Sequence, residues 1–439
     1  MPSMLDLWHS LSTPLQDALV LTVLLLPVLL LGHVLTRGYT PAPLIRAILW
    51  RYRFSNGMFV LLIAVAVGLG AALLVQERGL RTGTAEAADN FDMIIAAPGS
   101  EVSMLLAAVY LQPTNAGLLD GEMYARIAED PRVALAAPLA FGDSHEGAPI
   151  VGTTAEFLTV MSETLAEGHI WTEEPQAVIG IDVPMRMGEV FRPTHGFHTL
   201  TATVMHEDEL VVVGRMNRTG TPWDRAIVVP VESVWTVHGI ANGHAPDSPN
   251  QLGPPFDPEH FPGTPAIVVH GTSFGATYGL QTSYASSGET MAFFPGAVLA
   301  SLFSVMGDIR QAMSLMALVT QFLVAAAVLL GFFILSQLFQ RQMSLLRALG
   351  APSRFILSVI WGYASVLLIG GALLGLVLGF GFAALLAGII SARTGIAIPA
   401  GLGWEEVHLV AAFVALTSLA SVVPGIAVVR RDTVAGLRS

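Results

Sequence analysis

Long apolar stretches constrain the fold of this chain more than any other feature of its sequence. A helix needs about 20 mostly apolar residues to cross roughly 30 Å of hydrocarbon. Five stretches meet this requirement, at 15–35, 58–75, 315–339, 355–390 and 409–429. A mean hydropathy of +0.64 and a charged fraction of 12% agree with a membrane protein and exclude a disordered chain.

The arginines predict how these spans are oriented, because basic residues are enriched in cytoplasmic loops. They cluster between the first and second stretches, between the third and fourth, and after the fifth: Arg37, Arg46, Arg51, Arg53, Arg341, Arg347, Arg354, Arg430, Arg431 and Arg438. We therefore expect the N-terminus outside and the C-terminus inside. The first stretch has no basic residues before it and no clear cleavage site after it, so we expect a retained span rather than a signal peptide.

The predicted fold class is an integral membrane α-helical protein with about five transmembrane helices, N-out and C-in, and one large extracytoplasmic α+β domain between the second and third spans. The expected segments are an extra N-terminal span (1–36), a cytoplasmic amphipathic helix (37–56), a span (57–77), the α+β domain with a helical stalk (78–313), a span (314–340), a cytoplasmic helix (341–354), a span (355–390), an outer loop (391–407), a span (408–429) and a cytoplasmic tail (430–439).

The α+β prediction for 78–313 rests on short β-rich runs bounded by turn residues. FDMIIAA, LAAPLAF, LVVVGRM and PAIVVH are examples, and helical pieces at 122–128 and 154–162 lie between such runs. We read GDSHEG, which holds Asp143 and Ser144, as a turn rather than a catalytic group. This segment also contains most of the 33 acidic residues, which leaves the remainder of the chain net positive.

Two missing residue types exclude several kinds of chemistry. The chain has no cysteine, so disulfides, thiolate nucleophiles and Cys-ligated zinc are excluded. All 21 basic residues are arginine, so the lysine of a Walker A phosphate loop is missing too. No Asp, Glu or Arg lies within the five spans away from their ends, which argues against an ion-coupled transporter. We predict that the chain is not an enzyme and holds no cofactor of its own.

Three cytoplasmic segments carry a family resemblance. The approach to the second span reads LIRAILWRYRFSNG, the segment after the third reads QRQMSLLRALGAPSR, and the C-terminus reads VVRRDTVAGLRS. With the spacing of the spans, these resemble FtsX-like permeases of ABC transporters, the group with MacB and the lipoprotein-releasing LolC and LolE subunits. Gln342 stands where that family usually has Glu. The resemblance covers about 42–439, and FDMIIAAPGS is similar to the outer domain of the MacB type.

The resemblance implies that the chain transmits motion driven by a separate ATPase, which would bind ATP and Mg²⁺. A short cytoplasmic helix would contact that ATPase, with Gly350 as its stop; its expected coupling residues are Arg341, Gln342, Leu345, Leu346, Arg347, Leu349 and Gly350. Other implied partners are a second permease copy, which gives a homodimer, a periplasmic adaptor or binding protein, and membrane lipid, but no nucleic acid. The implied location is the bacterial inner membrane, with the large domain in the periplasm.

Two further groups of residues are candidates for packing or binding. Gly371, Gly375 and Gly379 form a GxxxGxxxG row, which lets helix backbones approach closely.

Nine of the twelve histidines lie in the outer segment, and His195, His198 and His206 stand near Glu207, Asp208 and Glu209. Since no HxH or HExxH spacing occurs, we predict no metal site from the sequence and keep these three histidines as candidates.

The function predicted from these observations is the permease subunit of a MacB/LolC-type ABC system that exports or extracts a substrate. One alternative is an FtsX-like transmembrane signal transmitter that regulates a periplasmic partner. A second alternative is an ABC permease involved in zinc homeostasis, which only the histidine enrichment suggests.

Overall fold

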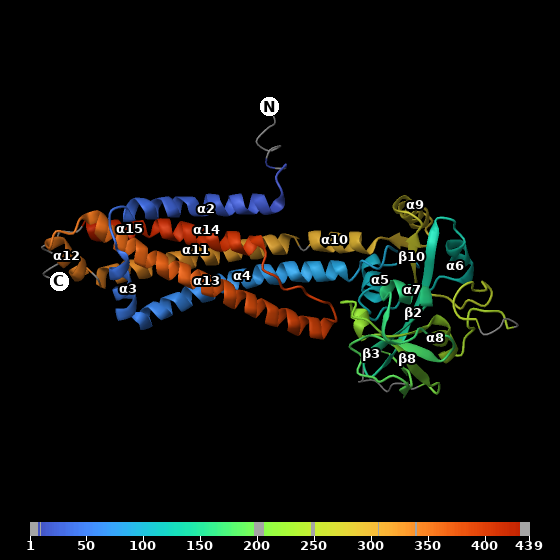
Figure 1. The fold of residues 1–439 in the computed structure, drawn as a ribbon. Helices are drawn as coiled ribbons and strands as arrows, with labels where there is room; N and C mark the ends of the chain where they lie inside the picture. The colour runs from blue at the N-terminus through green and yellow to red at the C-terminus, as the bar shows by residue number, and fades with distance from the viewer. Residues whose placement is uncertain are drawn as a thin grey trace, which may run out of the picture. The chain divides into compact units, whose positions relative to one another are not determined.

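The computed structural model describes residues 8, 10–196, 206–246, 251–305, 307–338 and 340–430. The chain divides into two compact units (Figure 1). One unit, made of helices, comprises Met1–Leu80, Asp308–Gly388 and Pro399–Ser439. The other, which holds the β-sheet, comprises Arg81–Gly307 and Ile389–Ile398.

The helical unit is built from long apolar helices and short amphipathic ones. Its helices, three of which continue past the unit's boundaries, are α2 (Thr13–Thr36), α3 (Ala42–Arg51), α4 (Arg53–Glu86), α11 (Gly307–Leu338), α12 (Gln340–Ala348), α13 (Ser353–Thr394), α14 (Trp404–Ala420) and α15 (Val422–Val429). Four described segments are long and apolar enough to cross a membrane: Thr13–Thr36, Arg53–Glu86, Ser353–Thr394 and Trp404–Val429. The third predicted span falls in α11, where the apolar stretch Leu318–Ile334 is shorter, so a total of five spans stays a prediction.

The ends of several predicted segments differ from the structure. The cytoplasmic helix predicted at 341–354 ends at Ala348, and the helices that hold the spans predicted at 57–77 and 355–390 run on to Glu86 and Thr394. The last apolar helix begins at Trp404 rather than 408, because the Glu406 carboxylate accepts a 2.7 Å hydrogen bond from the Gly403 N–H and so caps an earlier start. The outer loop predicted at 391–407 is correspondingly shorter. The amphipathic helix predicted at 37–56 ends at Arg51, and residues from Arg53 onward belong to α4.

Glu406 also forms the most buried ion pair of the helical unit among the described residues. Its side chain is fully buried, and the Arg78 guanidinium on α4 donates to it over 2.8 and 3.1 Å. A charge taken out of water is tolerated only when it is paired in this way. The pair therefore joins the first turn of α14 to α4.

The glycine row of α13 packs against α4. A Cβ atom at Gly375 would lie 2.7 Å from the Ala64 carbonyl oxygen, and one at Gly379 would meet the backbone of Gly68. A Cβ atom at Gly371 would meet the side chain of Ile63. The predicted close approach is thus between two helices of one chain.

The extra N-terminal helix α2 packs on α13 and α14. Gly32 leaves room for the indole of Trp361, which would lie 2.8 Å from a Cβ atom there. The Trp361 indole N–H in turn donates to the carbonyl of Ser418 over 3.1 Å. Figure 1 shows α2 beside α14 along its length.

The sheet unit contains one mixed sheet flanked by short helices. Its strands are β1 (Met93–Ala96), β2 (Val133–His145), β3 (Ala148–Thr153), β4 (Leu165–Gly168), β5 (Gln176–Ile179), β6 (Val190–Phe191), β7 (Thr194–His195), β8 (Leu210–Met216), β9 (Ile227–Pro230), β10 (Ala266–Gly271) and β11 (Met291–Phe293). The order is β11-β1-β10-β2-β3-β9-β5-β8-β4, with β7 paired to β2 and β6 to β8. The pairs β3–β9 and β5–β8 are parallel and the other pairs are antiparallel.

Both faces of this sheet are buried. Along β1, Ile95 belongs to one apolar cluster and Ile94 to another, as the alternation of side chains across a strand requires. Helices cover both faces. The face that contains Ile94 is covered by α5 (Glu101–Ala108), α7 (Ala155–Met161) and α10 (Pro295–Val305). The face that contains Ile95 is covered by α6 (Gly121–Ala128), α8 (Val231–Val237) and α9 (Phe274–Ala285). The helices α5, α6, α7 and α9 begin at side-chain caps, for example Asp120, which accepts from the Met123 N–H over 2.9 Å.

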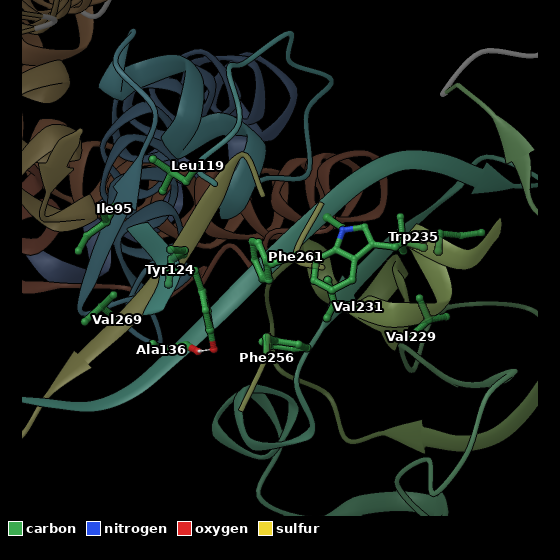
Figure 2. Close-up of a cluster of buried hydrophobic side chains, with 14 of the residues drawn as sticks. Ile95, Leu119, Tyr124, Ala136, Val229, Val231, Trp235, Phe256, Phe261 and Val269 are labelled. Carbon is green, nitrogen blue, oxygen red and sulfur yellow. Dashed lines mark hydrogen bonds between the residues drawn. The ribbon is translucent and has the colours of Figure 1, made fainter. Parts of the chain in front are cut away.

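An aromatic cluster fixes the long segment between α8 and β10 onto one face of the sheet (Figure 2). Tyr124 stacks on Phe261 with ring centroids 4.8 Å apart, and Trp235 meets the same ring edge-on at 4.9 Å. The Tyr124 hydroxyl donates to the carbonyl of Ala136 on β2 over 3.1 Å. The Pro- and Gly-rich stretch that contains Phe256 and Phe261 is thus held by its aromatic side chains.

Candidate functional site

The predicted cytoplasmic coupling segment contains the short helix α12 and a sharp stop. The N–H of Gly350 donates to the carbonyl of Arg347, and the N–H of Ala351 donates to that of Leu346, both over 2.9 Å. Gly350 has a φ of +95°, which favours glycine. These two bonds define a Schellman ending, so the helix ends where the sequence predicted a stop.

The three leucines of this segment, all expected as coupling residues, do not share one face. Leu346 is partly buried against the apolar cluster of the helical unit, next to the buried Met343. Leu345 and Leu349 are 48% and 85% exposed, and they follow each other at the i, i+4 spacing of one helix face. The surface available for a partner therefore contains Leu345 and Leu349, with the exposed Arg341 and Gln342, while Leu346 holds α12 in place.

A second group of side chains gathers in the sheet unit, around the carboxylate of Asp143. Its Oδ1 atom lies 3.2 Å from Nδ1 of His195, 3.4 Å from Nε2 of His206 and 3.6 Å from Nε2 of His238. The His195 Nδ1 and His238 Nε2 atoms are 3.4 Å apart. One ligand atom from each of the four residues lies within 4.8 Å of all the others. We call these four residues the His/Asp cluster.

Strand pairing and a helix end position the His/Asp cluster. Asp143 and His195 are direct partners in the antiparallel pairing of β2 and β7. His206 follows β7, and its backbone N–H donates to the carbonyl of Pro193 over 3.1 Å. His238 is the residue that ends α8, and its Nδ1 lies 2.7 Å from the carbonyl of Val234 in the last turn of that helix.

This last hydrogen bond determines which nitrogen of His238 faces Asp143. A carbonyl oxygen only accepts, so Nδ1 carries the proton and donates it to Val234. In the neutral ring Nε2 then has a bare lone pair, and this lone pair faces a carboxylate oxygen. This lone pair lies 3.6 Å from Oδ1 of Asp143 and 3.4 Å from Nδ1 of His195, so it can accept a proton from His195 or bind a metal cation.

The cluster also contains a polar atom that makes no hydrogen bond to the described residues. Nε2 of His206 is buried and has no hydrogen bond within the part of the chain that the structure describes. Asp143 is itself only 2% exposed, whereas His195 is open to solvent. A buried imidazole nitrogen without a partner costs free energy, and it needs either a water molecule or a cation.

The sequence identified part of this cluster. Of the candidates His195, His198 and His206, the structure brings the first and the third together, and His198 lies outside the described residues. His238 and Asp143 were missed. The prediction that Asp143 and Ser144 form a turn is wrong, because both lie in β2; the turn is at Glu146 and Gly147, which have φ values of +48° and +84°.

A buried carboxylate lies in another part of the sheet unit. Glu232 on α8 is 1% exposed, accepts from the Gly253 N–H, and has Nε2 of His244 at 3.4 Å from its Oε1. Burial is the main cause that raises the pKa of nearby Glu174, and the charge of Glu232 raises it further. Bonds within the protein account for these contacts, so we read this group as structural.

Comparison with known proteins shows a distant structural similarity. No protein-family model matches the chain, and no curated protein matches it. Among solved structures, the extracellular domain of the noncanonic ABC-type transporter YknZ from Gram-positive bacteria is similar at a TM-score of 0.27 and 11% identity. The match covers 46% of this chain and 98% of the YknZ domain. Similarity at this level does not assign the chain to a family.

Proposed function

We propose that this chain is the permease subunit of an ABC system of the FtsX and MacB type, in which a separate ATPase drives movement of the sheet unit outside the membrane. The observation that carries this proposal is α12. It is a short helix between two long apolar segments, it ends in a Schellman motif, and it exposes Leu345 and Leu349 on one side. Exposed apolar residues beside basic ones suit a groove on a partner protein.

The rest of the chain is consistent with this role. Four described segments fit membrane spans, and the sheet unit provides a large domain in which most acidic residues are concentrated. Without lysine the chain has no Walker A motif, so an ATPase partner would bring the nucleotide. A homodimer with two ATPases is the simplest closed assembly for such a system.

Purification of the tagged full-length chain from its native membrane tests the proposal. We expect an ATPase to be recovered with the wild type, and Leu349→Asp to lower its recovery at least tenfold. Leu118→Asp is the matched control, because Leu118 is 62% exposed in the sheet unit, and it should leave recovery unchanged. Recovery of no ATPase with the wild type, in a detergent that preserves other ABC complexes, would refute the permease role. Normal recovery with Leu349→Asp would refute the role of α12.

The same experiment addresses the signal-transmitter alternative. If the chain works as a transmitter, a periplasmic hydrolase should be recovered together with the ATPase, and no transported substrate should stimulate ATP hydrolysis. A role in metal homeostasis is supported by a separate observation, the His/Asp cluster.

A further inference from the structure

We propose that Asp143, His195, His206 and His238 form a zinc site in the sheet unit. The inference does not depend on the proposed permease function, because it rests on the geometry of these four residues alone. Three imidazole nitrogens and one carboxylate oxygen are a common donor set for Zn²⁺, which favours four ligands in a tetrahedron.

The distances between the donor atoms match a tetrahedral site. Metal–nitrogen bonds of about 2.0 Å place neighbouring ligands of a tetrahedron about 3.3 Å apart. Four of the six separations in the cluster are 3.2, 3.4, 3.4 and 3.6 Å. The other two separations are within 4.8 Å, so a cation at the centre needs side-chain shifts that shorten these two.

Protonation explains the cluster less well than a metal does. Without a metal, the one Nδ1 proton of His195 faces both the Asp143 carboxylate and the bare Nε2 of His238, and it can donate fully to only one of them. Nε2 of His206, which can carry the proton of a neutral ring, has no hydrogen bond within the described residues. A single divalent cation satisfies all four donor atoms at once.

The surroundings of the cluster agree with zinc binding. The carbonyl of Val234 accepts the second ring proton of His238, which is how metal-bound histidines are usually oriented. Exposed Glu207, Asp208 and Glu209 follow His206 directly and attract cations, although Arg192 pairs with Glu209 at 2.7 Å. Nitrogen-rich donors disfavour Ca²⁺ and Mg²⁺, which prefer oxygen.

Four protein ligands leave no position for a reactive water molecule. A zinc ion in this site would therefore be structural or regulatory and would not catalyse hydrolysis. His195 is exposed, so the ion can enter and leave directly from solvent.

Zinc binding to the full-length protein tests this inference. The protein is purified in detergent with a tag that contains no histidine, treated with a chelator, desalted and titrated with Zn²⁺ against a chromogenic chelator. We expect one tightly bound Zn²⁺ per chain. Co²⁺ in its place should show the intense visible bands of tetrahedral coordination. His206→Asn and His238→Asn should each weaken binding at least 100-fold, and Asp143→Asn should weaken it at least tenfold.

His169→Asn is the matched control, because His169 is an exposed histidine that follows β4 in the same unit, with its Nδ1 2.9 Å from the carbonyl of Ile170. It should bind Zn²⁺ like the wild type. Thermal melting without metal checks that each variant is folded, and His195→Asn provides a fourth ligand variant at an exposed position. The inference is overturned if the folded wild type binds no stoichiometric Zn²⁺, or if the His206→Asn/His238→Asn double variant still binds it with full affinity.

Discussion

At the scale of single residues, the glycines of α13 provide a matched pair of substitutions. Gly375→Ala places a methyl group against the Ala64 carbonyl and the Val67 side chain, so we expect a loss of about 1–3 kcal/mol in stability. Gly370 lies in the same helix with nothing within 4 Å of a Cβ atom, so Gly370→Ala should gain about 0.5–1 kcal/mol from helix propensity. Unfolding in detergent measures both. Equal effects would show that α4 and α13 do not pack in this way.

The raised pKa of Glu174 predicts that the stability of the protein depends on pH. Burial raises its pKa above the ordinary value of 4.5, so the folded state binds the proton more tightly than the unfolded state. The contribution of Glu174 to stability is therefore complete at a pH below its ordinary pKa. It is lost as the pH rises through the raised pKa of the folded state. Glu174→Gln should therefore gain melting temperature relative to the wild type as the pH rises from about 4 to about 8. Glu173→Gln, at the exposed neighbour, is the control, and a gain that is independent of pH would contradict the prediction.

The His/Asp cluster also shows which residues of the site the sequence could not predict. The histidine enrichment pointed to His195 and His206, but Asp143 lies 52 positions before His195 and His238 lies 43 after it. Only the pairing of β2 with β7 and the end of α8 bring them together. Such separations carry no local spacing signal of the HxH kind, and Asp143 in GDSHEG resembled a turn residue.

At the scale of elements, the apolar helices and the apolar strands β1, β2, β8 and β10 were predictable, and several short strands were not. The long helices follow from continuous hydrophobicity, which needs no information about neighbours. The strands β4, β6, β7 and β11 were missed, because segments such as LAEG and TH have no alternating pattern of their own and pair only in the context of the sheet. The segment MSLLRALG predicted a helix and its stop, but not which leucine faces inward.

The ion pair between Arg78 and Glu406 predicts a measurable contribution to stability from the contact between α14 and α4. Arg78→Ala leaves a fully buried carboxylate without its charge partner, which should cost about 3 kcal/mol. Glu406→Gln in the same chain should recover a large part of that loss, because no uncompensated charge then remains. Chemical unfolding of the single and double variants gives the coupling energy. Additive losses would show that the two side chains do not interact.

At the scale of the whole molecule, the chain is suited to a direct test of its topology, because it contains no cysteine. Single cysteines at Ser10, Ser286 and Ser353 should report on the N-terminus, the sheet unit and the start of α13. With an impermeant maleimide on intact spheroplasts, we expect Ser10→Cys and Ser286→Cys to react. Ser353→Cys should react only after permeabilisation. Labelling of Ser353→Cys from outside would show that α11 does not cross, and with it that the chain does not have five spans.

The four residues of the His/Asp cluster come from distant points of the sequence, and this has a consequence for folding. A metal ion that binds such points only in the folded chain adds its binding free energy to the stability of the fold. Secreted domains often rely on cystine crosslinks, which this cysteine-free sequence cannot form. A zinc ion between β2, β7 and α8 would provide a crosslink that oxidants and reductants leave intact and that opens and closes with the supply of metal.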